Sequence, residues 1–219
     1  GVLSLDIDGS DDMDKAPPLV KALIGFSNTM TPNHPLPVVR AEFLDHKGGG
    51  IVDKIVSEQV FFTPEEFRSA DHHIWGDFDQ YGQFKGMVAV YGREPVSYLV
   101  AWPPARGQKV ECGPFRINVA VVQGRASESR LPPEEWSRII EKMNKIGGLY
   151  IYRDGIRVLP YGNTDYDFLD IEFNRTKSAY YYYFSFRRMF GVIEIDQENN
   201  RDLNEKAGRE GFRENKAYR

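Results

Sequence analysis

The stretch Gly191–Tyr218, with the sequence GVIEIDQENNRDLNEKAGREGFRENKAY, carries the pattern on which the interpretation of this chain rests. Its apolar residues from Val192 to Ile195 predict a strand, which runs into a loop rich in Asn and Asp. Five residues after Asn204, the dipeptide Arg209-Glu210 stands where we expect a helix to begin. The stretch therefore predicts a strand, a polar loop and a helix in direct succession.

Upstream of this stretch, as far as residue 108, the pattern is regular. Residues 115–121 alternate apolar and polar, as a half-buried strand does. A helix is expected between Pro132 and Gly147, because four apolar residues follow the helical spacing: Trp136, Ile139, Ile140 and Met143. The dipeptide Asp154-Gly155 predicts the turn of a hairpin. Strand, helix and strand in this order predict a right-handed βαβ unit, so residues 108–219 read as an α+β domain.

The first half of the chain, residues 1–107, is predicted to be rich in β-structure. Thr63 is a good helix N-cap, because Pro64 suits the first turn and Glu66 can close a capping box. The stretch Pro103–Gly107 reads as a linker or long loop between the two halves. Strands are expected at Leu3–Ile7, Val39–Phe43, Ile74–Asp79, Phe84–Tyr91 and Val96–Trp102. The third and fourth of these flank Gln80–Gln83, which predicts a hairpin.

Composition narrows the class of protein. With 41% hydrophobic and 27% charged residues among 219, the chain reads as globular, and no apolar run approaches the length of a membrane span. A single cysteine, Cys112, excludes an internal disulfide and fits a reducing compartment, so we expect a cytoplasmic protein. The net charge of −4 does not favour nucleic-acid binding. Since the chain opens with Gly1 and ends in an expected helix, we interpret it as a fragment.

An ordered set of segments in the second half resembles the transducer (middle) domain of GHKL ATPases, the superfamily of gyrase, the heat-shock-protein-90 chaperones, histidine kinases and MutL. The set comprises Gly113-Pro114-Phe115, Gly148–Arg153, Gly191–Glu194 and Arg209-Glu210. The closing residues look closest to bacterial ATPases of the heat-shock and MORC type, several of which belong to anti-phage or restriction-like systems. The resemblance implies a βαβ core like that of a small-subunit ribosomal protein.

The resemblance also implies a division of labour with a preceding nucleotide-binding domain, which would hold ATP and Mg²⁺ in the full-length protein. In such proteins an arginine of the middle domain reaches the γ-phosphate, and the matching residue is Arg209. Lys206 and Lys216 are weaker candidates for the same phosphate. The chain itself lacks the GHKL nucleotide motifs and a phosphate loop, so we expect no cofactor and no ATPase activity for this fragment alone. A homodimer is left open.

An arginine suits this role because the guanidinium carries a permanent charge in a planar fork that matches phosphoryl oxygens. Delivery from a second domain makes hydrolysis depend on domain closure. The alternative is structural: Arg209 lies four residues after Glu205, and the two could form an ordinary surface pair.

A rival interpretation from another class is a non-enzymatic α+β binding module for a protein or nucleic-acid partner. Its surface would be the aromatic and basic segment Tyr180–Arg188, although such runs are more often buried strands. We expect no metal site, because the adjacent His72 and His73 point to opposite faces of a strand and lack further ligands at useful spacing.

Overall fold

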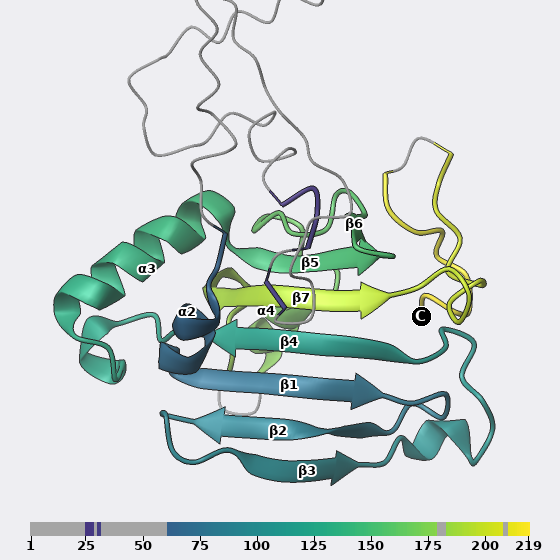
Figure 1. The fold of residues 1–219 in the computed structure, drawn as a ribbon, viewed down its shortest axis with the longest axis horizontal. Coiled ribbons are helices and arrows are strands. Elements are labelled where there is room, and N and C mark those ends of the chain that lie inside the picture. Colours follow the sequence, from purple (N-terminus) through teal and green to yellow (C-terminus); the bar gives the residue numbers. More distant parts are fainter. Residues whose placement is uncertain (1–24, 29, 32–60, 179–182, 208–209) are drawn as a thin grey trace, which may run out of the picture.

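The computed structural model describes residues 25–28, 30–31, 61–178, 183–207 and 210–219. The strands predicted at 3–7 and 39–43 lie outside the described residues. Within the described part, one mixed sheet of seven strands forms the centre of the molecule, with few helices, so the fold is α+β (Figure 1). The strands follow each other across the sheet in the order β3-β2-β1-β4-β7-β5-β6.

The strand bounds agree with most of the sequence predictions. The first hairpin is closed by Asp79, whose carboxylate accepts the backbone N–H groups of Tyr81 and Gln83 at 2.8 and 2.9 Å. The second predicted hairpin, with Asp154 and Gly155 both at positive φ, is also confirmed. The seven strands are β1 (His72–Phe78), β2 (Phe84–Val90), β3 (Val96–Val100), β4 (Phe115–Val121), β5 (Gly148–Arg153), β6 (Ile156–Arg157) and β7 (Met189–Ile195).

The sheet continues across the expected boundary between residues 107 and 108. β1 of the first half pairs with β4 of the second half over seven residues, from His72 opposite Val121 to Phe78 opposite Phe115. The predicted linker contains a short 3-10 helix, η1 (Pro103–Ala105), and connects β3 to β4 of the same sheet. Residues from both halves therefore share one sheet.

The predicted right-handed βαβ unit is wrong. Such a unit requires parallel strands, but β4 is antiparallel to β7, and β7 is parallel to β5, so β4 and β5 run in opposite directions. β7, the last of the described strands in chain order, lies between them and supplies the parallel neighbour of β5. Figure 1 shows β7 between β5 and β4, with the β4 arrow pointing the other way.

Two of the helices form where the sequence predicts them. Helix α2 (Pro64–Ser69) begins with the predicted capping box of Thr63 and Glu66. Helix α3 (Pro133–Ile146) buries Ile139, Ile140 and Met143 against the sheet, as the helical spacing predicts. The remaining helices are α4 (Ile171–Lys177), which the sequence analysis did not predict, and the 3-10 turns η2 (Ala126–Glu128) and η3 (Phe186–Arg188).

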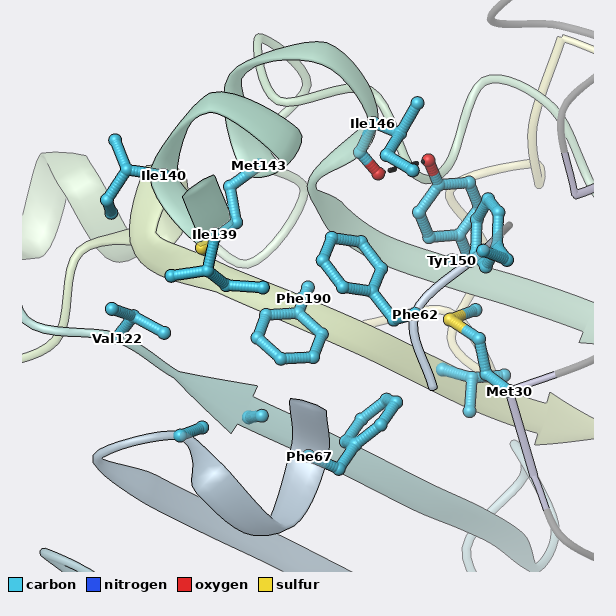
Figure 2. Packing of buried hydrophobic residues seen from close by; sticks show 14 of the residues in the cluster. Met30, Phe62, Phe67, Val122, Ile139, Ile140, Met143, Ile146, Tyr150 and Phe190 are labelled. Carbon is cyan, nitrogen blue, oxygen red and sulfur yellow. Dashed lines mark hydrogen bonds between the residues drawn. The ribbon is translucent and has the colours of Figure 1, made fainter. Parts of the chain in front are cut away.

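The face of the sheet toward α2 and α3, termed the helix face, carries the largest core (Figure 2). Phe190 of β7 lies at its centre and stacks on Phe62 at 4.1 Å between ring centroids, with Phe67 at 4.9 Å. Tyr150 donates its hydroxyl to the carbonyl of Ile146 at 2.6 Å, which ties β5 to the last turn of α3. Burial raises the pKa of Tyr150 to about 12, so this donor stays protonated.

On the opposite face, termed the loop face, the described segments pack mainly over β4, β7 and β5. There, residues of the segment between β6 and β7 and of the C-terminal segment pack on the strands, among them Tyr161, Phe168, Phe186 and Phe212. Over the rest of β2 and over β3, no described segment packs on this face, and Val90, Val96, Tyr98 and Val100 are exposed, whereas Phe84 is buried. Among the described residues, the sheet thus has a two-sided core at one end and an exposed apolar surface at the other.

The two edges of the sheet differ. At the β6 edge, residues 25–28 form a further rung: Ser27 bridges Ile156, and the N–H of Asn28 donates to the carbonyl of Gly155 at 3.1 Å. Asn28 also donates its side-chain amide to Glu194 at 2.7 Å. The β3 edge has no such cover among the described residues.

The helix predicted to begin at Arg209 is not formed in residues 210–219. Gly211 has φ of +96°, which an α-helix does not allow, and Phe212 forms a β-bridge with Glu205 instead. The side chain of Phe212 is buried against Tyr161. Tertiary packing of this one aromatic residue therefore overrides a local sequence that favours helix.

Candidate functional site

The candidate site is the C-terminal loop, residues 196–219, which carries all three residues singled out by the resemblance. It leaves the sheet at the end of β7, where the carbonyl of Ile195 accepts the N–H of Asp154 at 3.0 Å. Asn200, which is fully buried, fixes the first turn. Its side-chain amide donates to the carbonyls of Cys112 and Pro114 at 2.6 and 2.9 Å. The loop is thereby attached to the entrance of β4.

Asp196 holds this first turn together. Its carboxylate accepts the backbone N–H of Asn199 at 2.6 Å and the side-chain amide of Asn199 at 2.8 Å. Desolvation raises the pKa of Asp196, but these donated hydrogen bonds outweigh it, so the net pKa is lowered. The turn is therefore built around an ionised carboxylate.

Further along, the chain doubles back on itself. The N–H of Arg213 donates to the carbonyl of Asn204 at 2.8 Å, and the N–H of Lys206 donates to the carbonyl of Gly211 at 2.8 Å. Together with the bridge between Glu205 and Phe212, these bonds make residues 204–206 and 211–213 a paired base. Arg209 lies between the two paired segments in sequence, outside the described residues.

Arg153, the last residue of β5, braces this paired base. Its Nη1 donates to Oε1 of Glu205 at 2.8 Å, and its Nη2 donates to the carbonyl of Leu203. The guanidinium also lies over the ring of Phe212, 5.1 Å from its centroid. The Arg153 side chain is only 13% exposed, which makes these contacts stronger than those of a surface pair. One guanidinium thus joins both segments of the base to the sheet.

Phe212 anchors the returning segment from the other side. Its ring stacks on Tyr161 at 5.4 Å between centroids, and its N–H donates to the Tyr161 hydroxyl at 3.2 Å. Gly211 allows this approach, because its φ of +96° would strain any residue with a side chain. A Cβ at this position would also lie 3.3 Å from the Tyr161 hydroxyl and from Pro160. Burial is the main cause of the raised pKa of Tyr161. Its hydroxyl remains protonated at neutral pH.

The two lysines have different environments. Lys206 is exposed, and its ammonium has no carboxylate partner in the part of the chain that the structure describes. The Lys216 ammonium is also exposed but forms an ion pair with Glu111. Lys206 lies in the paired base, whereas Lys216 lies in the following turn. Of the two, Lys206 is nearer to Arg209 along the chain and is not engaged by an acidic side chain there.

Arg153 and Tyr161 are the residues of this site that sequence reasoning missed. Arg153 ends the segment Gly148–Arg153 that entered the resemblance, but its partner Glu205 lies 52 residues away, and no local pattern reveals that pairing. Tyr161 follows the hairpin and carries no spacing signal. Their roles depend on tertiary contacts alone.

The rival surface, Tyr180–Arg188, is described only from Tyr183 onward. Phe186 is fully buried in the loop-face core, so it is not available to stack on a base. Tyr183 is 53% exposed, and its hydroxyl accepts a hydrogen bond from the Gln123 amide at 2.9 Å. The carboxylate of Glu172 accepts from the Ser185 hydroxyl, which places negative charge beside the segment.

The side chain of Gln123 belongs to a buried polar network beneath Tyr183. It lies within 3.2 Å of His72 Nε2 and donates to the Tyr91 hydroxyl at 2.8 Å. The fully buried Asp71 nearby accepts the backbone N–H groups of Gln123 and Arg130, both at 2.7 Å. The hydrogen bond with Tyr183 is the main cause that raises the pKa of Tyr91 to about 12. These contacts join β1, β2 and the loop before α3, which is a structural role.

The described residues contain no group of three or more His, Cys, Asp or Glu side chains placed to hold a metal ion. Within the same residues, no helix is long and apolar enough to cross a membrane. A surface hollow lined by Tyr81, Gln83, Trp102 and residues 103, 105–107 lies next to the β3 edge and includes no residue of the C-terminal loop. The described residues of the C-terminal loop thus form a braced base, and Lys206, Ala207 and Glu210 are exposed.

Comparisons with known proteins give no relative: no family, curated protein or solved structure matches the chain.

Proposed function

We propose that this chain is the middle, transducer-type segment of a GHKL-type ATPase, and that its C-terminal loop presents Arg209 to the γ-phosphate of ATP held by a preceding nucleotide domain. The observation that supports the proposal is the braced base of the loop. Arg153 joins Glu205 and Phe212 to the end of β5, and the residues on both sides of Arg209 are paired by backbone hydrogen bonds. A group that must meet a transition state gains from such positioning.

Charge is consistent with this role. The carboxylate of Glu205, which a helical spacing would pair with Arg209, accepts a hydrogen bond from Arg153. Lys206, on the outgoing segment, has an ammonium without a carboxylate partner in the described chain and would add positive charge near a phosphate. In the proposed mechanism the nucleotide domain holds adenine, ribose and Mg²⁺, and Arg209 stabilises the charge that develops on the transferred phosphoryl group.

The test is an Arg209→Ala variant of the protein that includes the preceding nucleotide domain. ATP affinity should be nearly unchanged, while turnover should fall by about 10²- to 10³-fold, as expected for loss of one transition-state donor. Arg209→Lys should restore little, because a point charge does not reproduce the planar fork. The matched control is Arg213→Ala, since Arg213 is an exposed arginine of the same loop. Wild-type turnover in Arg209→Ala would end the proposal.

The second candidate function is a binding module centred on Tyr183, favoured by the exposure of that side chain. With a net charge of −4 and Glu172 beside the segment, we expect only weak and strongly salt-dependent binding to single-stranded DNA or RNA. Fluorescence anisotropy across a salt series would measure it. A tight complex at physiological salt that is lost in Tyr183→Ala and Arg188→Ala would favour the binding module over the transducer.

A further inference from the structure

No segment in the described part of the chain pairs with the outer edge of β3. In the β1–β2 hairpin, Asp79 donates its N–H to Gln83 and Tyr91 donates to Asp71, so the odd-numbered residues of β2 point their backbone groups toward β1. The even-numbered residues of β2 therefore bond to β3, where they face Val96, Tyr98 and Val100. By the same alternation, the N–H and C=O groups of Ser97 and Leu99 point away from the sheet.

This edge lacks the devices that keep other edges unpaired. Val96–Val100 contains no charged residue and no proline, and its pairing with β2 runs without a bulge. All five residues are exposed, including Leu99 at 73% and Val96 at 55%. At the opposite edge of the sheet, Ser27 forms a β-bridge with β6. The two edges of the sheet therefore differ in whether a described segment pairs with them.

β3 can pair with β3 of a second copy of the chain in antiparallel orientation. A two-fold axis through Tyr98, perpendicular to the sheet, sets the strand antiparallel to a second copy. Tyr98 then lies opposite Tyr98 of that copy, and Val96 lies opposite Val100. Ser97 and Leu99, whose backbone groups point outward, form the hydrogen-bonded pairs, while Tyr98 occupies the closer non-hydrogen-bonded position.

The same axis keeps corresponding faces of the two sheets on the same side. The exposed apolar side chains of the loop face, Val96, Tyr98 and Val100, would pack on their symmetry mates across the new strand pair. At Pro95 and Pro103 the chain leaves the strand direction, and proline has no N–H to continue a ladder. The complementary edge is therefore confined to about the length of β3.

From these observations we infer that β3 is a homodimer interface, in which two copies of this chain join edge to edge through an antiparallel β3–β3 pair centred on Tyr98 and form one continuous sheet. This inference does not depend on the proposed ATPase role. An edge of five residues is smaller than a standard protein interface of about 1,200–2,000 Å², so a Kd on the order of 10 µM is expected.

Sedimentation analysis of the chain at concentrations from about 1 to 200 µM tests the inference. The wild type should pass from monomer to dimer across this range. Tyr98→Lys and Tyr98→Glu should each remain monomeric, because the two-fold axis sets like charges opposite each other. Mixing the two variants in equal amounts should restore a heterodimer, since residue 98 then meets an opposite charge.

The matched control is Phe173→Lys, which places the same charge at an exposed aromatic residue of α4 and should dimerise like the wild type. Circular dichroism should show that all variants fold, as Tyr98 is nearly half exposed. A wild type that stays monomeric throughout would overturn the inference. So would Tyr98 variants that still dimerise alone, or a mixture that fails to associate, because each contradicts a pair centred on Tyr98.

Discussion

Replacing Arg153 by alanine should loosen the C-terminal loop while leaving the sheet intact. The change removes hydrogen bonds from a charged group to Glu205 and Leu203, worth about 1.5–3 kcal/mol, and a contact with the Phe212 ring worth about 0.5–1 kcal/mol. Because the Glu205 side chain is 29% exposed, water can take over part of its bonding. We therefore expect a local loss of about 2–3 kcal/mol.

Hydrogen exchange reports this loss directly. The amides of Lys206, Phe212 and Arg213 are hydrogen-bonded within the braced base, so their exchange should accelerate by roughly 30- to 150-fold in Arg153→Ala. Amides of the β1–β2 hairpin should exchange as in the wild type. Arg213→Ala is the control, since it removes only an exposed side chain. Unchanged exchange at these three amides in Arg153→Ala would refute the bracing role.

Three further outcomes are expected. Phe190→Ala should destabilise the protein by about 3–5 kcal/mol in urea unfolding, because its ring fills the centre of the helix-face core, whereas Phe173→Ala, at 59% exposure, should cost less than about 0.5 kcal/mol. Desolvation lowers the pKa of His72 and of His73 below 6.5 in the folded protein. As the pH drops through 6.5, these histidines therefore bind protons in the unfolded chain before they do so in the folded protein, and the free energy of unfolding should fall. A rise in the free energy of unfolding on acidification would contradict this. Isothermal titration calorimetry of residues 1–219 with ATP and Mg²⁺ should show no saturable binding, and a one-site micromolar isotherm would refute the assignment of nucleotide binding to another domain.

Local structure followed from the sequence where the signal was itself local. The hairpin turns at Asp79 and Asp154 and the capping box at Thr63 each depend on a few adjacent residues, and the structure confirms them. Helix α3 was also predicted correctly, because the apolar residues at helical spacing lie on a single face that packs against one core.

Strand order was not readable in this way. The insertion of β7 between β4 and β5 is decided by pairing across long separations, such as Tyr150 opposite Val192. A strand–helix–strand pattern without that information favours a parallel unit, which is why the βαβ prediction failed.

The candidate site was only partly predictable. A resemblance directed attention to Arg209, Lys206 and Lys216, but it carried a helix into a segment where Gly211 requires positive φ. The contacts that organise the site come from Arg153 and Tyr161, and they become visible only when β5 and the C-terminal loop are brought together.

The position of β7 has a consequence for biosynthesis. Of the seven described strands, β7 is synthesised last, yet it is the neighbour of both β4 and β5, and Phe190 completes the packing of Phe62 and Phe67. Until it emerges, the nascent chain holds a half-sheet with the β4 edge unpaired and apolar side chains uncovered, the state in which chaperones bind and misassociation begins. Chains that terminate before Met189 lack the strand that joins β4 to β5, and we expect them to be more susceptible to proteolysis.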